Sequence, residues 1–313
     1  MRAYILEEFG GIDRLLLKDI NIPEVADNQV LVKVNAISIN PVDVRTRAGS
    51  AMAQFLKQDM PLILGWDIAG QVVSVGAGVA KFKVDDRVFG MVNFLGHGKG
   101  YAEYVAAPET HLAKIPSNTN FEEAAAATLS ALTVWQFLVH EAKIKSGDKV
   151  LVQAASGGVG HYAVQIAKHF GAYVIGVSSS KNKDFVLSLG ADEHISYDQQ
   201  EVSDVISNAD IVVDAFAFDS LYKSLKIVKQ GGLIISLLPM ISEEVIEKAK
   251  EKNVKIFYSL VKSNEADIQS IAKLLEIGAI KSRISKIFPF GKMGEAHLAM
   301  ESGKTVGKII VRV

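Results

Sequence analysis

Short runs of alternating and β-branched apolar residues dominate the first part of the chain. They include Val30 to Ala36 (VLVKVNA), Gly70 to Val75 (GQVVSV) and Tyr101 to Ala106 (YAEYVA), separated by Gly, Pro and Asp residues. A period of two is typical of strands with one buried face, and the separating residues favour turns. The pattern predicts an all-β unit for this part.

The period changes near residue 120. The segment from Phe121 to Glu141 is rich in Ala and Leu and begins with acidic residues, which predicts a helix. From Lys149 to Leu238, apolar strand-like runs alternate with amphipathic helix-like runs, and no further element is predicted before Glu265. Such alternation predicts an α/β fold with a doubly wound parallel sheet, whose ligand binds at the carboxyl ends of the strands.

The tail returns to a different pattern. A helix is predicted over Glu265 to Gly278, followed by two β-like runs, Ser285 to Phe288 and Lys308 to Val313. This tail is too short to fold alone. We expect its strands to complete the N-terminal β unit.

Composition narrows the function classes. The 313 residues are 49% hydrophobic, carry a formal net charge of −1 and include no cysteine. Disulfides, thiolate nucleophiles and thiolate-bound zinc are therefore excluded, and no basic patch favours nucleic acid. No apolar run is long enough to span a membrane, so we expect a cytoplasmic protein that does not enter membranes.

A glycine-rich turn follows the first strand of the predicted parallel sheet. Aligned on G-x-G-x-x-G, it comprises Ala155, Ser156, Gly157, Gly158, Val159 and Gly160, with Ala in place of the first Gly. Gly157 and Gly158 allow backbone to approach a pyrophosphate, and Gly160 allows the helix to pack closely on the sheet. The position between a strand and a helix indicates a dinucleotide site.

Serines and lysines stand where dinucleotide-binding proteins specific for NAD carry an acid. Ser178, about 20 residues after the turn, lies in the run GVSSSKNK, which contains no carboxylate. Hydroxyls and ammonium groups can hold a 2′-phosphate, so the run favours NADPH. The alternative is an ordinary solvated polar loop.

The chain resembles the zinc-independent quinone oxidoreductases of the medium-chain dehydrogenase/reductase superfamily along its whole length. The similar segments are SINPVDVRTRAG, LGWDIAGQVVSVGAGV, VDDRVFG, AEYV, SALTVWQFL, AASGGVGHYAVQIAK, LGADEHISY and ESGKTVGKIIV. The resemblance implies a GroES-like substrate domain from residues 1–120 plus 256–313 and a Rossmann NADPH-binding domain from 121–255, with a cleft where they meet. It also implies NADPH as hydride donor and a quinone or α,β-unsaturated carbonyl compound as acceptor.

The same resemblance suggests roles for individual residues. The pyrophosphate is expected at Ser156, Gly158 and Val159, the 2′-phosphate at Ser179, Lys183 and Tyr197, the nicotinamide at Thr133, Leu237, Phe257 and Tyr258, and Phe216 beneath the cofactor. Asn40 and Asp43 are expected to face the cleft. Zinc-dependent relatives have Gly-His-Glu where this chain has Gly65, Trp66 and Asp67, so no metal site is expected.

Several alternatives stay open. Charge that develops on a substrate carbonyl needs a hydrogen-bond donor, for which Asn40, Tyr258 or water are candidates. Asp43 either acts in catalysis or caps a helix, and Asp67 either lines the cleft or caps a turn. The chain could also be a non-catalytic NADPH-binding sensor or structural protein, and could be a monomer or a homodimer.

Overall fold

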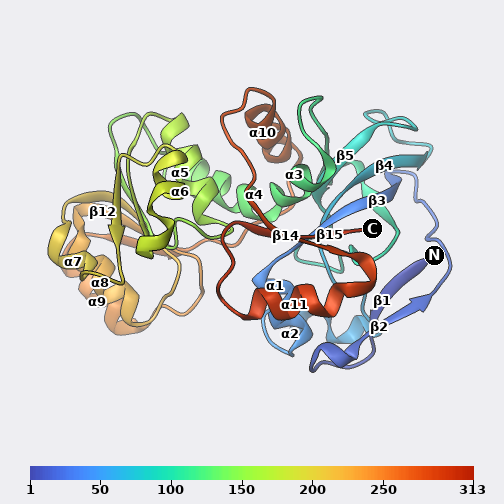
Figure 1. Ribbon diagram of the computed structural model, residues 1–313, viewed down its shortest axis with the longest axis horizontal. Coiled ribbons are helices and arrows are strands. Elements are labelled where there is room, and N and C mark those ends of the chain that lie inside the picture. The colour runs from blue at the N-terminus through green and yellow to red at the C-terminus, as the bar shows by residue number, and fades with distance from the viewer. The chain divides into compact units, whose positions relative to one another are not determined.

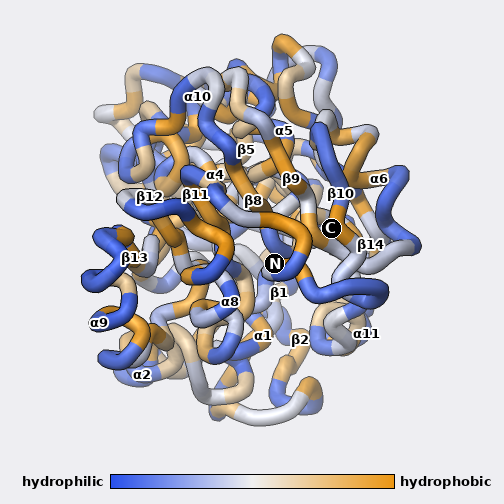
Figure 2. The backbone as a smooth tube through the Cα atoms, turned by 90° about the vertical axis from the view of Figure 1, so that its left-hand side faces the viewer, coloured by the Kyte–Doolittle hydropathy of each residue, from blue (hydrophilic) through white to orange (hydrophobic).

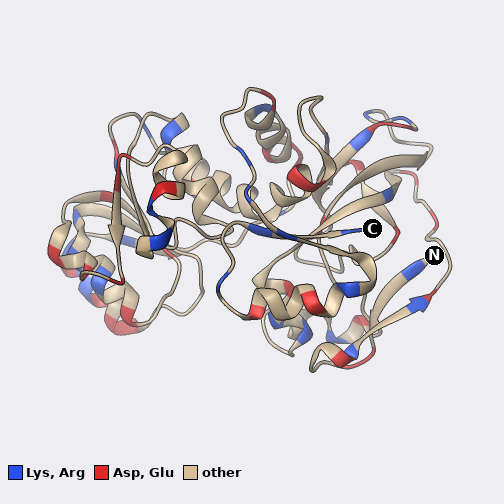
Figure 3. Ribbon diagram, viewed as in Figure 1, with Lys and Arg blue, Asp and Glu red and all other residues tan.

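The computed structural model describes residues 1–313 and contains two compact units. Unit 1 combines Met1–Leu132 with Lys262–Val313, and unit 2 is the continuous segment Thr133–Val261. Lys and Arg residues are interspersed with Asp and Glu in both units (Figure 3). None of the helices combines the length and apolar character needed to cross a bilayer.

Unit 1 is built on a seven-stranded sheet of order β14-β15-β3-β4-β5-β7, with β6 paired to β3 and a separate β1-β2 hairpin (Figure 1). The strands are β1 (Arg2–Leu6), β2 (Leu15–Asp19), β3 (Gln29–Ile39), β4 (Asp67–Val75), β5 (Arg87–Met91), β6 (Tyr104–Pro108), β7 (Leu112–Lys114), β14 (Ile284–Pro289) and β15 (Lys308–Arg312). The helices are α1 (Pro41–Arg47), α2 (Ala53–Leu56), α3 (Phe121–Ala126), α10 (Glu265–Glu276) and α11 (Met293–Glu301), while α4 (Leu129–Trp135) crosses into unit 2.

The two C-terminal strands join the N-terminal sheet, as predicted. β15 pairs antiparallel with β3, and β14 pairs parallel with β15. β3 is central because β15, β4 and β6 all pair with it, and its residues are buried on both faces of the sheet almost throughout.

Unit 2 contains a six-stranded parallel sheet of order β10-β9-β8-β11-β12-β13. Its strands are β8 (Lys149–Val152), β9 (Tyr173–Ser178), β10 (Glu193–Ser196), β11 (Ala209–Asp214), β12 (Val228–Ser236) and β13 (Lys255–Tyr258). Its helices are α5 (Gly160–His169), α6 (Lys183–Ser188), α7 (Val202–Val205), α8 (Asp219–Ile227) and α9 (Glu243–Glu251), with a π-helical turn, η4, over Gln136–Glu141.

The parallel sheet lies between two groups of helices. Within unit 2, α8 and α9 lie together on the other side of the sheet from α5 and α6 (Figure 1). The strands are buried on both faces, which requires continuous apolar runs. β8 and β11 accordingly appear orange in Figure 2, whereas the solvent-facing α9 is largely blue. The doubly wound prediction is confirmed.

The predicted domain boundaries at 120/121 and 255/256 differ from the division of the structure at 132/133 and 261/262. Helix α3 packs on β3 and β4 and so belongs to unit 1. Strand β13 pairs with β12 and so belongs to unit 2. Both differences come from tertiary packing, which local pattern does not report.

The helix predicted over residues 121–141 is three consecutive segments, α3, α4 and η4. The first break lies at Thr128, whose hydroxyl donates to the Ala125 carbonyl at 2.7 Å. The next helix then begins at Leu129, whose backbone N–H donates to Asp67 Oδ1 at 3.1 Å. A side chain from β4 therefore caps the start of α4.

Candidate functional site

The carboxyl edge of the parallel sheet collects the residues predicted to bind a cofactor. They follow or end β8 (Ser156, Gly157, Gly158, Val159, Gly160), β9 (Ser178, Ser179, Lys183), β10 (Tyr197), β11 (Phe216), β12 (Leu237) and β13 (Phe257, Tyr258). Thr133, the other predicted cofactor residue, lies in α4 and is 8% exposed. Ligands of open parallel sheets bind at this edge.

The glycine turn joins β8 to α5 in very little space. Gly157 N–H donates to the Ala154 carbonyl at 2.8 Å, which closes the turn. A Cβ on Gly160 would lie 2.1 Å from the Ala154 carbonyl oxygen and 2.8 Å from the Ala155 Cα. Only glycine therefore lets α5 begin so close to the strand end, which agrees with the reason given for Gly160. The helix directs its N-terminus toward this edge, where a pyrophosphate is favoured.

Ser178, the last residue of β9, and the two serines that follow it lie in three different environments. Ser178 is 2% exposed, and its hydroxyl is 2.7 Å from His194 Nε2 on the neighbouring strand β10. Ser180 donates from its hydroxyl and its backbone N–H to the Asp198 carboxylate, each at 2.9 Å. The Ser179 hydroxyl accepts a hydrogen bond from Asn182 at 3.1 Å.

Ser178 ends β9, as the sequence count suggested, but its hydroxyl is engaged within the protein. Its side chain lies against β10 and is held by His194, because β10 neighbours β9 in the sheet. The contact of Ser178 with a cofactor stays a prediction. Ser179 follows the strand, and its hydroxyl is bound by Asn182 instead of by His194.

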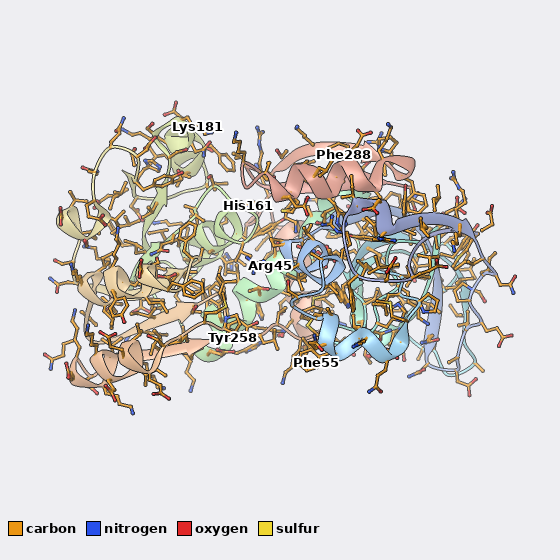
Figure 4. The ribbon with its side chains drawn as sticks, turned by 90° about the horizontal axis from the view of Figure 1, so that it is seen from below. Arg45, Phe55, His161, Lys181, Tyr258 and Phe288 are labelled. Atoms are coloured by element: carbon orange, nitrogen blue, oxygen red, sulfur yellow. The ribbon has the colours of Figure 1, made fainter.

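Two further predicted groups around this loop are open to solvent. Lys183, at the start of α6, is exposed, and Tyr197, directly after β10, is 59% exposed. Both are free to meet a ligand from solvent. Lys181 and Tyr258 lie toward opposite ends of unit 2, with His161 of α5 between them (Figure 4).

The backbone turn that carries Phe216 is held by the buried carboxylate of Asp214, a residue that the sequence analysis did not single out. Asp214 Oδ1 accepts from the backbone N–H groups of Phe216 at 3.0 Å and Ala217 at 2.9 Å. Its Oδ2 accepts from the hydroxyls of Ser220 at 2.8 Å and Ser224 at 2.7 Å. Phe216 is 56% exposed as a result. An acid at the end of an apolar strand, in DIVVDAF, was the available signal.

Tyr258 is half-buried at the end of β13, the edge strand of the parallel sheet. Burial raises the pKa of its hydroxyl above the ordinary value of 10.0. The phenol is therefore protonated at neutral pH and can donate a hydrogen bond. Phe257 beside it and Leu237 after β12 are partly buried.

Unit 1 contains a buried polar cluster formed by Asn40, Asp43, Asp67, Ser130 and Lys308. Asn40 Nδ2 donates to Asp67 Oδ2 at 2.7 Å, and the Lys308 ammonium donates to Asn40 Oδ1 and, at 3.1 Å, to the Ser130 hydroxyl. Asn40 and Lys308 are each 1% exposed, and Asp43 and Asp67 are 0% exposed. Four segments distant in sequence therefore meet here.

Asn40 and Asp43 lie together, but neither is exposed to a substrate within unit 1. Asp43 is the third residue of α1. Its Oδ2 accepts a hydrogen bond from the Asn40 backbone N–H at 2.6 Å and so caps the start of the helix. Both ends of the Asn40 amide are engaged by Asp67 and Lys308. The expectation that these side chains face a cleft stays a prediction. Within unit 1 they are buried groups at the start of α1.

Burial shifts the pKa values of the two acids and the lysine in this cluster toward their neutral forms. Burial raises the pKa of Asp43 to about 8, with the Asn40 N–H opposing and the neighbouring Asp67 adding to the rise. Burial also raises the pKa of Asp67 against the attraction of Lys308, and lowers the pKa of Lys308 against the attraction of both acids. Asp43 is therefore mainly protonated at neutral pH and is no base there.

The residues at the sheet edge fit a dinucleotide and do not fit a metal ion. The Ser156 and Ser179 hydroxyls near the start of α5 suit phosphate oxygens. Zinc needs several Cys, His or carboxylate ligands, but the chain has no cysteine and contains no group of three or more His, Asp or Glu side chains arranged to hold a metal.

Two family models match the chain. An alcohol dehydrogenase GroES-like domain matches residues 26–117, and a zinc-binding dehydrogenase domain matches residues 189–311. With a β-rich unit and a parallel nucleotide-binding sheet, these matches define the class of nicotinamide-dependent dehydrogenases and reductases.

Full-length relatives narrow this class. The chain is 34% identical over 328 residues to human quinone oxidoreductase, covering 99% of this chain and 97% of that one. It is 32% identical over 321 residues to the chloroplastic NADPH-dependent alkenal/one oxidoreductase of Arabidopsis thaliana, covering 99% and 79%. The solved quinone oxidoreductase of Coxiella burnetii is similar with a TM-score of 0.93 and 35% identity, covering 100% and 99%. The chain belongs to the quinone oxidoreductase family of the medium-chain dehydrogenase/reductase superfamily.

Proposed function

We propose that this chain reduces quinones or α,β-unsaturated carbonyl compounds with NADPH and without a metal ion. The observation that carries the proposal is the carboxyl edge of the parallel sheet. There the Gly157–Gly160 turn opens α5, and the loop after β9 offers the Ser179 hydroxyl and the exposed Lys183 ammonium. The names of the full-length relatives supply the acceptor class.

NADPH is proposed over NADH because of the groups that surround Ser179. The carboxylate of Asp198, which lies against this loop, is already hydrogen-bonded by Ser180. The Ser179 hydroxyl is hydrogen-bonded to Asn182 rather than to a carboxylate, and Lys183 is exposed, so we propose that a 2′-phosphate meets a hydroxyl and an ammonium there. Tyr197 is proposed to cover the adenosine end, because its ring is exposed beside the same loop.

The reaction is a two-electron reduction. A bound NADPH supplies a hydride, and one proton taken up from water or a protein group completes the hydroquinone or the saturated carbonyl product. The protein then needs to orient the acceptor and to donate a hydrogen bond to the oxygen that gains charge. Tyr258 is proposed as that donor, because its hydroxyl is protonated and partly accessible.

The test is turnover by the purified full chain. We expect oxidation of NADPH, followed by absorbance, with a panel of quinones and enones, and slower oxidation of NADH. Activity is expected to survive exhaustive chelation, because the chain lacks a ligand set for zinc. Simple primary alcohols with NADP⁺ are expected to give no reaction.

Three results would contradict this proposal in different ways. Activity that is lost with one bound zinc and restored by adding it would overturn the metal-free reaction. Efficient alcohol oxidation would overturn the acceptor class. Tight binding of NADPH with no turnover of any acceptor would favour a non-catalytic sensor or structural role.

A further inference from the structure

Asn182 connects the two loops that are proposed to hold phosphates. Its side-chain amide Nδ2 donates to the Ser156 hydroxyl in the glycine turn and to the Ser179 hydroxyl after β9, each at 3.1 Å. Ser156 and Ser179 are each 9% exposed, so both contacts lie at the margin of the folded interior. One amide group therefore bridges segments 26 residues apart in the chain.

The direction of these two hydrogen bonds decides what the serines can do. A hydroxyl has one hydrogen to donate and two lone pairs, and an amide nitrogen can only donate. Both serines therefore act as acceptors toward Asn182. No hydrogen bond in the structure uses the hydroxyl hydrogen of Ser156 or Ser179, so both hydrogens are free to be donated to an anion.

The other two serines of the loop differ in this respect. The Ser180 hydroxyl donates its hydrogen to Asp198, and the Ser178 hydroxyl is buried between His194 and the Ser179 carbonyl. Ser179 is thus the one serine of the three whose hydroxyl hydrogen stays available. The residue that keeps it available is Asn182.

The Asn182 side chain also does not make the hydrogen bond that is usual for Asn at the start of a helix. It occupies the N-cap position of α6, where an Asn side chain usually accepts a hydrogen bond from the first turn of the helix. Here the side chain makes no capping bond and reaches to the two serines instead. Its neighbour Lys181, labelled in Figure 4, extends from the same turn.

We infer that Asn182 is a positioning residue for the cofactor, which orients the Ser156 and Ser179 hydroxyls as donors toward the pyrophosphate and the 2′-phosphate. This inference rests on the proposed use of NADPH. It adds that the two phosphate sites are coupled, because one side chain sets the donor direction at both.

The experiment compares two replacements of Asn182 in the full chain, with dissociation constants for NADPH and NADH. Asn182→Asp keeps the size but presents oxygens that accept the two hydroxyl hydrogens, whereas Asn182→Ala only removes the bridge. Each lost charge-assisted bond weakens binding about tenfold or more. We expect Asn182→Asp to weaken NADPH about a hundredfold and NADH about tenfold, and Asn182→Ala to have a smaller effect on both.

Two further variants separate positioning from general damage. Ser188→Ala lies in the same helix, α6, but removes an exposed hydroxyl bound only to the Phe185 carbonyl, so cofactor affinity should stay within about twofold of the wild type. In a Ser179→Ala background, Asn182→Asp should lose its extra effect on NADPH and weaken both cofactors alike. Thermal unfolding midpoints check that each variant is folded.

The outcomes distinguish this inference from the proposed function. If Ser179→Ala weakens NADPH selectively but both Asn182 variants bind like the wild type, the positioning role is overturned and the cofactor preference stands. Equal binding of NADPH and NADH by the wild type, with no effect of Ser179→Ala, overturns both. A larger loss with Asn182→Ala than with Asn182→Asp also overturns the role, because donor direction would then be irrelevant.

Discussion

Asp43 is a buried acid whose environment favours the protonated form. Its Oδ1 has no hydrogen-bond partner, its Oδ2 accepts from the Asn40 N–H, and Asp67 lies in the same cluster. Burial raises its pKa to about 8, compared with about 3.9 in an unfolded chain. Between these two values the folded state holds a proton that the unfolded state releases, so the contribution of Asp43 to stability falls as the pH rises.

The first prediction follows from this loss of stability with rising pH. Replacing Asp43 by Asn removes the titrating group but keeps an acceptor for the Asn40 N–H. Relative to the wild type, Asp43→Asn should gain free energy of unfolding as the pH rises from about 5 to about 8, by up to about 1.4 kcal/mol per pH unit. Urea unfolding across this range measures the difference. The exposed Asp27→Asn is the control, and an Asp43→Asn difference as flat as that of Asp27→Asn would contradict the burial argument.

The second prediction concerns Tyr258. If its protonated hydroxyl donates to the acceptor oxygen, Tyr258→Phe should lower kcat by about a hundredfold while cofactor affinity changes little. The ring stays in place, so packing at the end of β13 is preserved. Steady-state kinetics with a quinone and with an enone provide the measurement. Tyr173→Phe, an exposed tyrosine on β9, serves as control. Unchanged turnover by Tyr258→Phe would leave water as the donor.

Individual residues were predictable where their role depends on local geometry. The glycine turn was found because tight strand-to-helix turns need glycine, and Gly160 fits that reason. The Ser178–His194 contact and the Asn182 bridge were missed, since they depend on which strands become neighbours. Asn40, Asp67 and Lys308 meet for the same kind of reason, and no spacing in the chain indicates it.

Among the elements, the start of α5 has no room for an added side-chain atom. A methyl group on Gly160 would overlap the Ala154 carbonyl oxygen at 2.1 Å. Gly160→Ala should therefore move α5 away from β8, destabilise the protein by about 1–3 kcal/mol and weaken both NADPH and NADH. Denaturant unfolding and cofactor titration test this third prediction. Gly291→Ala, which meets no atom within 4 Å, should change neither quantity; equal behaviour of the two variants would contradict the steric argument.

Elements with strong periodicity were predictable, and those that depend on packing were not. The apolar strands of the parallel sheet and the two C-terminal strands were found. Helix α9 was missed because it buries only Val245 and Ala249 and is otherwise polar, and α11 because apolar and polar residues are poorly separated on it. Strand β13 was missed because it has only four residues and gains its identity from pairing with β12.

At the scale of the whole molecule, the two units differ in how the chain builds them. Unit 2 is one continuous segment, Thr133–Val261, with its own sheet and apolar core, including Leu151, Val212, Ile234 and Leu221. Unit 1 needs both ends of the chain, because β15 pairs with β3. Cutting the chain at the unit boundaries therefore leaves unit 2 whole but separates the two parts from which unit 1 is built.

The last prediction uses this difference. A fragment of residues 133–261 should fold cooperatively and bind 2′,5′-ADP more tightly than 5′-AMP, since the proposed 2′-phosphate contacts all lie within it. A fragment of residues 1–132 should not fold, because β3 would lose its partner β15 and expose an apolar sheet edge. Joining residues 262–313 to it through a flexible linker should restore a folded unit. Circular dichroism, thermal unfolding and calorimetry measure these outcomes. A folded 133–261 fragment that binds both nucleotides equally would show that the 2′-phosphate contacts are not where Ser179 and Lys183 lie.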